Sequence, residues 1–218
     1  MSAHQHTHQH HDPARHLSPV EHWEQRYSGE DRVWSGRVNA PLAQVVAGFA
    51  PGRSIDLGCG EGGDVLWLAE QGWEAHGLDI SATAVGRARE EAAARGLTNA
   101  TFTATDLDGW EPEPATVDLV TASFFQSGVA LDRTAILRRA ATAVRPGGHL
   151  VIISHAAPPS WAKDHPATMI GAAEDARQLA LPAEDWEVLI AEDRPRAAVA
   201  PDGSAGEHLD AVLVLRRR

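Results

Sequence analysis

The chain has 218 residues, which fits one domain of ordinary size with a short appendage. Its formal net charge is -11, from 30 acidic and 19 basic residues. This balance disfavours a nucleic-acid partner or an anionic membrane surface, because both are held mainly through lysine and arginine. The single cysteine, Cys59, excludes an internal disulfide framework and a multi-cysteine metal site. No apolar run reaches membrane-spanning length and no apolar signal segment is visible, so we expect a cytoplasmic protein.

Residues 1–17 are polar and rich in histidine. They contain too few apolar side chains to bury much surface, so we expect a disordered tail followed by a single domain over residues 18–218. Imidazoles at this density bind zinc, nickel or copper readily, and the candidate ligands are His4, His6, His8, His10 and His11. The tail leaves a rival interpretation open, a metal-binding protein on a non-catalytic cofactor fold, which activity without the tail would exclude.

From Arg53 onward the sequence predicts strands that alternate with helices. Five strands are expected over residues 54–57, 73–79, 100–105, 117–123 and 149–154, with helices between most of them. Such an alternation predicts parallel pairing through right-handed crossovers. Two further strands, over 186–191 and 209–215, are joined by a polar loop and predict an antiparallel hairpin. The expected fold is therefore doubly wound, Rossmann-like α/β, with a mostly parallel sheet of seven strands.

A glycine-rich segment follows the first strand and reads Asp56-Leu57-Gly58-Cys59-Gly60-Glu61-Gly62-Gly63-Asp64. Glycines at this point let the chain turn sharply from strand to helix and let a ligand approach the backbone. Asp79 ends the second strand, 21 residues after Gly58, where a carboxylate can accept hydrogen bonds from both ribose hydroxyls of an adenosine. The crevice at this edge of the sheet is therefore the predicted site for a nucleotide-like ligand.

Spacing alone does not identify that ligand, because the dinucleotide fingerprint is also satisfied, by Gly58, Gly60 and Gly63. An NAD(P)-binding oxidoreductase therefore remains an alternative. Against it, Asp56 suits a ligand with an ammonium group at a position where a dinucleotide site usually has an apolar residue. Asp106-Leu107, after the third strand, suits an adenine amino group beside an apolar ring contact, and a terminal hairpin is unusual for a dinucleotide domain.

At these residues the chain resembles the class I methyltransferases, and the resemblance runs from about Trp23 to the C-terminus. Its motifs occur in the family's order: DLGCGEG from Asp56, Leu78-Asp79-Ile80-Ser81, Thr105-Asp106-Leu107, Asp118 in the fourth strand and Pro146-Gly147-Gly148. The resemblance implies S-adenosylmethionine as the cofactor. The residues that it assigns to cofactor binding are Asp56, Gly58, Cys59, Gly60, Asp79, Ile80, Asp106, Leu107, Ser123, Phe124 and Trp34.

The N-terminal residues resemble one branch of that family more narrowly. His22-Trp23 to Tyr27 and Val33-Trp34-Ser35-Gly36-Arg37 look like the N-terminal segment of the tellurite-resistance and thiopurine-methyltransferase branch, in which the segment folds over the cofactor. Residues 18–38 are therefore expected to form a lid that excludes water from the site. The alternative is a helix that packs on the sheet edge for stability alone.

The expected acceptor is a small molecule. After the fourth strand the chain reads Ser123-Phe124-Phe125-Gln126, in place of the Asn-Pro-Pro-Tyr type of motif that marks many amino-group methyltransferases of nucleic acids. The two phenylalanine rings suit a sulfonium or a substrate, or else fill the core. The candidate catalytic base is His155, at the end of the fifth strand, with His165 as a second candidate. A hydrogen-bonded structural role is the alternative for His155.

Overall fold

A computed structural model of the chain describes residues 17–162 and 169–218; the five tail histidines and His165 lie outside this part. The elements are α1 (Pro19–Tyr27), α2 (Ala40–Val46), β1 (Arg53–Leu57), α3 (Gly63–Glu70), β2 (Glu74–Asp79), α4 (Ala82–Ala94), β3 (Ala100–Ala104), β4 (Val117–Ser123), α5 (Arg133–Ala141), β5 (Val144–Ala157), α6 (Ala172–Leu179), β6 (Trp186–Val199) and β7 (Ala205–Arg217). No helix in the described part is long and apolar enough to cross a membrane.

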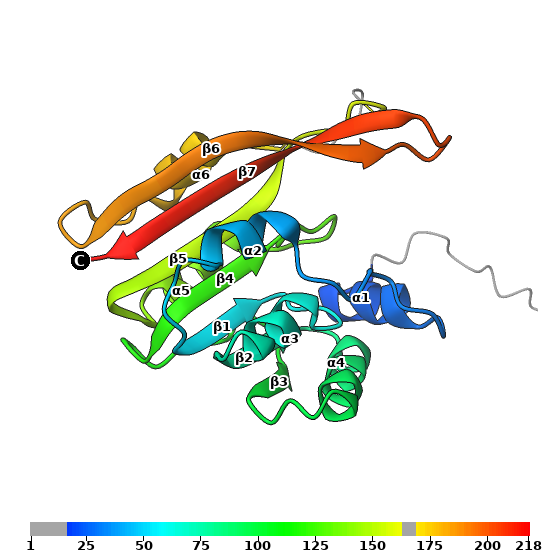
Figure 1. Cartoon of the computed structure of the whole chain (residues 1–218), viewed down its shortest axis with the longest axis horizontal. Coiled ribbons are helices and arrows are strands. Elements are labelled where there is room, and N and C mark those ends of the chain that lie inside the picture. The colour runs from blue at the N-terminus through cyan, green and yellow to red at the C-terminus, as the bar shows by residue number, and fades with distance from the viewer. Residues whose placement is uncertain (1–16, 163–168) are drawn as a thin grey trace, which may run out of the picture.

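The seven strands form one sheet in the order β3-β2-β1-β4-β5-β7-β6 (Figure 1). Pairing is parallel from β3 to β5, and β7 joins β5 and β6 in antiparallel register. Strand order reverses at β1, which places the glycine-rich segment at the point where ligands bind in open α/β sheets. The predicted doubly wound fold with a C-terminal antiparallel hairpin is confirmed.

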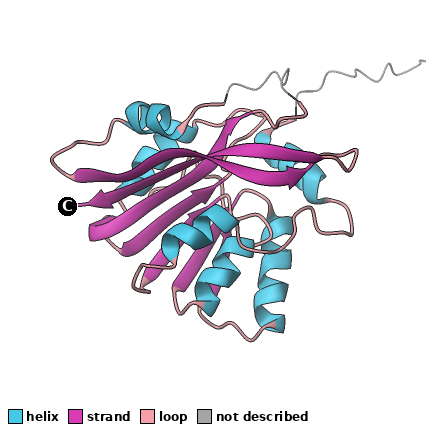
Figure 2. Cartoon of the chain, turned by 45° about the horizontal axis from the view of Figure 1, so that its top comes forward, coloured by secondary structure: helices cyan, strands magenta, loops and turns pink. Residues whose placement is uncertain are grey.

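Each central strand presents alternate side chains to two helical layers, one on each face of the sheet (Figure 2). In β5, Leu150 and Ile152 pack in the core that is shared with α5 and α6. Val151 and Ile153, the residues between and after them, pack in the core shared with α2, α3 and α4. Because both faces are buried, the strand is apolar over its whole central length, as is usual for parallel sheets.

Local sequence signals begin the two helices nearest the site. Ser18 and Glu21 form a capping box at the start of α1, where Pro19 occupies the first turn. The Ser81 hydroxyl accepts a hydrogen bond from the Ala84 amide at 3.1 Å and so caps α4. Glu24 of α1 joins this helix to the first turn of α4, because its carboxylate accepts a 2.6 Å hydrogen bond from the Thr83 hydroxyl. Helix α1 is therefore attached to the domain beside the carboxyl ends of the parallel strands.

The C-terminal hairpin is longer than the sequence predicts. Strand β6 continues to Val199 and β7 begins at Ala205, so the predicted polar loop over residues 192–208 is wrong. The segment escapes a pattern-based prediction because residues 192–196 consist of four charged residues and Pro195, which an edge strand tolerates. Beyond the last β5–β7 pair, Ala157 with Leu209, the two strands of the hairpin pair with each other, and the Ser160 amide donates to the Glu207 carbonyl at 3.0 Å.

Two smaller differences concern elements around β5. The Pro146-Gly147-Gly148 segment lies within β5 rather than before it, as an irregularity between the pairs Val117–Val144 and Leu119–His149. Helix α6 is not among the predicted elements. It is short, and an ion pair between Arg133 and Asp175 holds it against α5, with both nitrogen–oxygen distances at 2.7 Å.

Candidate active site

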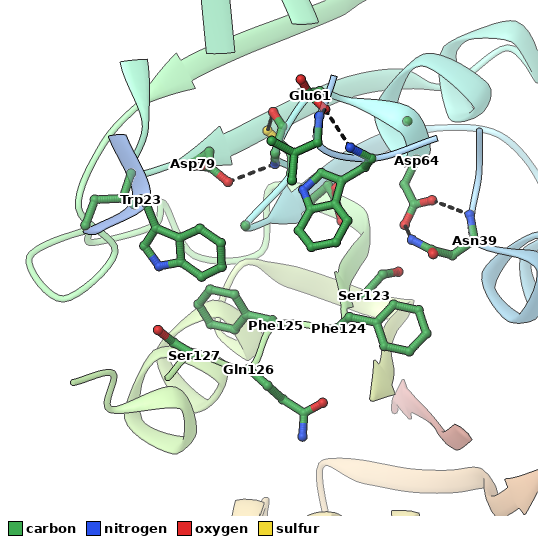
Figure 3. Close-up of a pocket in the computed structure, with 18 of the residues that line it drawn as sticks. Trp23, Asn39, Glu61, Asp64, Asp79, Ser123, Phe124, Phe125, Gln126 and Ser127 are labelled. Carbon is green, nitrogen blue, oxygen red and sulfur yellow. Dashed lines mark hydrogen bonds between the residues drawn. The ribbon is translucent and has the colours of Figure 1, made fainter. Parts of the chain in front are cut away.

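A cavity of about 670 Å³ opens where β1, β2 and β4 end and α1 begins (Figure 3). The structure brings every residue that the sequence assigned to the cofactor or to catalysis, among those it describes, to the wall of this cavity: Asp56, Gly58, Cys59, Gly60, Asp79, Ile80, Asp106, Leu107, Ser123, Phe124, Trp34 and His155. Residues from β5, β6 and β7 line its far end. The cavity therefore extends from the glycine loop to the C-terminal hairpin.

The glycine loop is shaped by close contacts as well as by its turn. Gly58 and Gly60 have φ angles of +66° and +51°, in the left-handed region that favours glycine. A Cβ atom on Gly58 would lie 2.6 Å from the ring of Phe125, and one on Gly60 would lie 2.9 Å from the Tyr27 hydroxyl. Glycine is therefore required at both positions for the loop to fit between Phe125 and the N-terminal segment. Cys59 is buried between them, as expected for a small core residue.

Asp79 is held in place by two backbone amides of the site itself. The Gly60 amide donates to one carboxylate oxygen and the Ser81 amide to the other, each at 2.8 Å. Burial raises the pKa of Asp79, and these two amides oppose that shift. Each oxygen still has lone pairs that can accept a further hydrogen bond from a ligand.

Two more carboxylates are buried beside the loop. The Thr121 hydroxyl donates to Asp56 at 2.6 Å, while Asp64 accepts hydrogen bonds from the backbone amide and side-chain amide of Asn39, at 2.7 and 2.9 Å. Burial raises the pKa of both acids, and the neighbouring charge of Asp64 raises that of Asp56 further. The sequence analysis named Asp64 only as the last residue of the glycine-rich segment and assigned it no role in the site. A cationic ligand group would stabilise the ionised forms of these acids.

Glu61 attaches the N-terminal segment to the glycine loop. Its buried carboxylate accepts hydrogen bonds from the amides of Val33 and Trp34, both at 3.0 Å, and from Arg87 of α4 at 2.8 Å. Arg87 also donates to backbone carbonyls of the same segment, those of Tyr27, Gly29 and Asp31. Residues 27–34 are therefore held above the loop by the carboxylate of Glu61 and the guanidinium of Arg87. The sequence analysis missed both, because their partners are backbone atoms far away in the chain.

Trp34 closes the cavity without belonging to the core. Its indole N–H donates to the Tyr27 hydroxyl at 2.9 Å, and 51% of the residue is exposed. Tyr27 itself is buried and lies beside the ring of Trp23, with 6.2 Å between the ring centroids. The aromatic residues of the N-terminal segment thus form part of the cavity wall.

Phe124 and Phe125 project into the cavity from a tight turn at the end of β4 (Figure 3). Phe124 has a φ angle of +52°, which is rare for a residue with a side chain and costs energy. Two backbone hydrogen bonds stabilise it: its amide donates to Ile153 at 2.6 Å, and the Gln126 amide donates to its carbonyl at 2.8 Å. Strain maintained in this way is typical of functional sites.

His155 lies at the far end of the cavity. Its imidazole stacks on the ring of His208 and lies against the tilted ring of Phe124, at centroid distances of 5.1 and 4.5 Å. Its Nδ1 atom is 3.3 Å from a carboxylate oxygen of Asp210. Asp210 is 1% exposed and also accepts hydrogen bonds from Arg196, at 2.5 and 3.2 Å. Burial disfavours its charged form, but the hydrogen bonds from His155 and Arg196 lower the pKa of Asp210 overall.

The sequence analysis missed Arg196, His208 and Asp210. Arg196 and His208 face each other across the extended part of the hairpin, which was predicted to be a loop. Asp210 lies in a strand that the sequence predicts, but the sequence shows no basic residue that would pair with a buried acid there. Within the described residues there is no cluster of three or more histidine, cysteine, aspartate or glutamate side chains arranged to hold a metal ion.

Comparison with known proteins agrees with this geometry. Residues 55–148 match the family described as methyltransferase domain. A 2-heptyl-1-hydroxyquinolin-4(1H)-one methyltransferase of Mycobacteroides abscessus is 32% identical over 58% of this chain and 58% of its own length. The ribosomal RNA small subunit methyltransferase C of Alcanivorax borkumensis is 34% identical over 54% of this chain and 37% of its own length. The chain thus spans less than two thirds of these curated relatives.

Solved structures cover more of the chain. One that concerns the conversion of a disulfide bond into a thioacetal group during echinomycin biosynthesis has a TM-score of 0.69 and 27% identity, over 91% of this chain and 92% of that one. TehB from Haemophilus influenzae shares the fold, with a TM-score of 0.66 and 15% identity over 91% of this chain and 67% of that one. Together with the glycine loop, these matches support a class I S-adenosylmethionine-dependent methyltransferase, with residues 55–148 as the part that matches the methyltransferase domain.

Because Trp34 is half exposed, its replacement can distinguish a role in covering the cavity from a role in stabilising the fold. In Trp34→Ala we expect turnover to fall strongly while the melting temperature changes little, since an exposed ring contributes little buried area. The matched control is Trp73→Ala, a core residue 2% exposed, which should cost about 3–5 kcal/mol with turnover per folded molecule preserved. Preserved turnover in Trp34→Ala, measured together with calorimetric melting, would show that the segment only packs.

Proposed function

We propose that this protein transfers a methyl group from S-adenosylmethionine to a nucleophilic atom of a small molecule. The observation that carries the proposal is one continuous cavity with two unlike ends. Buried carboxylates surround the glycine loop at one end, and aromatic rings with two imidazoles line the other. When bound, the cofactor supplies an electrophilic methyl group on its sulfonium. The protein then has to align the acceptor with that methyl and exclude water.

The residues of the first end fit an adenosine that carries an amino acid. Asp79 is placed to accept the ribose hydroxyls, and Ile80 and Leu107 to cover the adenine ring, with Asp106 at its amino group. Asp56 and Asp64 would bind the ammonium group. Gly58, Cys59 and Gly60 offer the backbone of the loop, while Ser123 and Phe124 would lie beside the methyl donor.

The same carboxylates speak against the dinucleotide alternative. A pyrophosphate at the glycine loop would approach Asp56, Glu61 and Asp64, all 5% exposed or less. Like charges at such burial repel strongly, whereas an ammonium and a sulfonium are attracted. The comparisons give no support to an oxidoreductase or to a metal-binding protein on a non-catalytic fold. The proposed tail ligands, His4 to His11, lie outside the described residues.

Residues 18–38 act as the lid in this proposal. Support comes from the hydrogen bonds of Glu61 and Arg87, which hold this segment over the glycine loop, and from the position of Trp34 in the cavity wall. A lid attached to the cofactor loop itself would order as the cofactor binds and would exclude water from the sulfonium.

At the acceptor end we assign catalysis to His155. Its ring lines the cavity, and its Nδ1 atom is bonded to a buried carboxylate, the arrangement in which a histidine works as a general base. Such a base is required only when the acceptor is protonated at neutral pH. We further propose that the protein works in the cytoplasm, which agrees with its single cysteine being free and buried.

A small-molecule acceptor is supported by the ring-lined cavity and by the acidic charge of the chain. Two similar proteins are named for small molecules, a hydroxyquinolinone in one case and echinomycin in the other. The relative named for ribosomal RNA argues the other way, so nucleic acid needs a direct test.

The cofactor assignment is tested at Asp79. In Asp79→Ala, calorimetry should show S-adenosylhomocysteine binding weakened roughly tenfold to several-hundredfold, because each charge-assisted hydrogen bond to the ribose contributes about 1.5–3 kcal/mol. NAD should not bind to either protein. The control is Asp118→Ala, which removes a carboxylate that accepts a backbone hydrogen bond from Arg53 outside the cavity, at 2.9 Å. That variant should lose stability and keep its affinity, and unchanged affinity in Asp79→Ala would refute the assignment.

Nucleic acid is tested by a mobility shift at physiological salt. With a net charge of -11 the protein has little capacity to neutralise phosphates, so duplex DNA and structured RNA should both migrate freely. A clear shift at micromolar protein would overturn the small-molecule acceptor.

A further inference from the structure

The far end of the cavity is made by the extended part of the hairpin. Arg196 on β6 pairs with His208 on β7, and both line the cavity together with His155 at the end of β5. Asp210 lies behind them, with one oxygen shared between His155 and Arg196 and the other bonded to Arg196. These four side chains form one connected polar group around a single imidazole.

Three contacts restrain His155. The His208 ring stacks on its imidazole, the Phe124 ring lies against it at a tilt of 39°, and the Gln126 side chain accepts a 3.0 Å hydrogen bond from its backbone amide. Because Asp210 is held ionised by Arg196, it can only accept, so the neutral ring carries its proton on Nδ1. The lone pair of Nε2 is then free, and within the described part of the chain that atom has no hydrogen-bond partner.

The charges facing His155 are few and can be named. Asp210 and His208 come from β7 and Arg196 from β6, while the turn after β4 contributes the uncharged Phe124 and Gln126. Burial, followed by the charge of Arg196, lowers the pKa of His208, which keeps that second imidazole neutral. This end of the cavity therefore favours an acceptor that becomes negative as it reacts over one that is already cationic.

Aromatic rings fix the shape of the acceptor. Trp23, Phe124 and Phe125 project into the same opening (Figure 3). His208, on β7 of the hairpin, lines the same cavity. Rings arranged around a cavity favour a flat, aromatic ligand through stacking and edge contacts.

Resting on the proposed function, we propose that the acceptor is a hydroxyl or thiol carried by an aromatic ring, and that Asp210 and Arg196 are positioning residues for His155. In the reaction the acceptor oxygen or sulfur forms a bond to the methyl carbon, and the carbon–sulfonium bond breaks with its electron pair retained by sulfur. The acceptor proton moves to Nε2 of His155 and then to solvent. The products are the methyl ether or thioether, S-adenosylhomocysteine and one proton.

The two positioning residues carry opposite charges, so their removal should have opposite effects. Asp210→Asn takes away the charge that stabilises the imidazolium, which should move the acidic limb of the kcat profile down by roughly one pH unit and lower kcat at least about tenfold. Arg196→Gln should move the same limb up by roughly one unit. In the complex with S-adenosylhomocysteine, imidazole nitrogen NMR should show the same two displacements and a proton on Nδ1 in the unaltered protein.

The matched control is the ion pair of Arg133 and Asp175, which has the same two-point geometry but lies outside the cavity. Asp175→Asn should lower the melting temperature and leave the acidic limb in place. A limb that fails to move in Asp210→Asn and Arg196→Gln, or that moves equally in Asp175→Asn, would refute the positioning role.

The acceptor class is tested with phenol and thiophenol at pH 8. Phenol, with a pKa of about 10, arrives protonated and needs a base, whereas thiophenol is largely ionised and does not. His155→Gln should therefore lose phenol methylation by about a hundredfold or more and keep thiophenol methylation within a few-fold. Equal losses on both would show that His155 is no base. Methylation of neither compound by the unaltered protein, with S-adenosylhomocysteine bound, would refute the acceptor class, whereas failure to bind that nucleoside would refute the proposed function itself.

Discussion

Four buried carboxylates around one glycine loop are the constraint on which the rest of the site depends. Asp56, Glu61, Asp64 and Asp79 are between 2% and 7% exposed, and burial of this much negative charge is costly unless each group has donors. Each has its own: a threonine hydroxyl, the N-terminal segment with Arg87, the two amides of Asn39, and the backbone amides of Gly60 and Ser81. The donors come from several different elements, so the hydrogen bonds to these carboxylates also fix the positions of those elements relative to the glycine loop.

This arrangement couples the N-terminal segment to the glycine loop. Glu61 lies within the glycine loop, yet its carboxylate accepts the backbone amides of Val33 and Trp34. Any shift of the loop on ligand binding is therefore felt by the segment that covers it. The two ends of the cavity also differ in their lining: buried carboxylates surround the glycine loop, whereas Arg196, His155 and His208 line the end at the hairpin. In the proposed function the first end binds the cofactor and the second end holds the acceptor.

Much of the cofactor end could be predicted from sequence because its signals are local. The glycines, Asp79 and the Asp106-Leu107 pair each follow directly after a strand, and the carboxyl ends of parallel strands meet at one edge of the sheet. The acceptor end could not be predicted in the same way. Arg196 and Asp210 become neighbours only through antiparallel pairing, and that part of β6 has a run of charged residues interrupted by a proline, which resembles a loop. Glu61 and Arg87 were missed for a related reason, since backbone amides and carbonyls leave no mark in the sequence.

The most direct measurement of the central claim, that buried acids select a cationic nucleoside, is the proton balance of binding. Burial and the charge of Asp64 raise the pKa of Asp56 in the free protein, and a ligand ammonium would favour its ionised form. Binding of S-adenosylhomocysteine should therefore release protons and weaken as the pH falls from 8 to 5, as calorimetry in buffers of different ionisation enthalpy can show. Asp56→Asn, and 5′-methylthioadenosine, which lacks the amino acid, should each abolish the release. Equal proton release with both nucleosides, or an affinity for S-adenosylhomocysteine that does not depend on pH, would contradict the account.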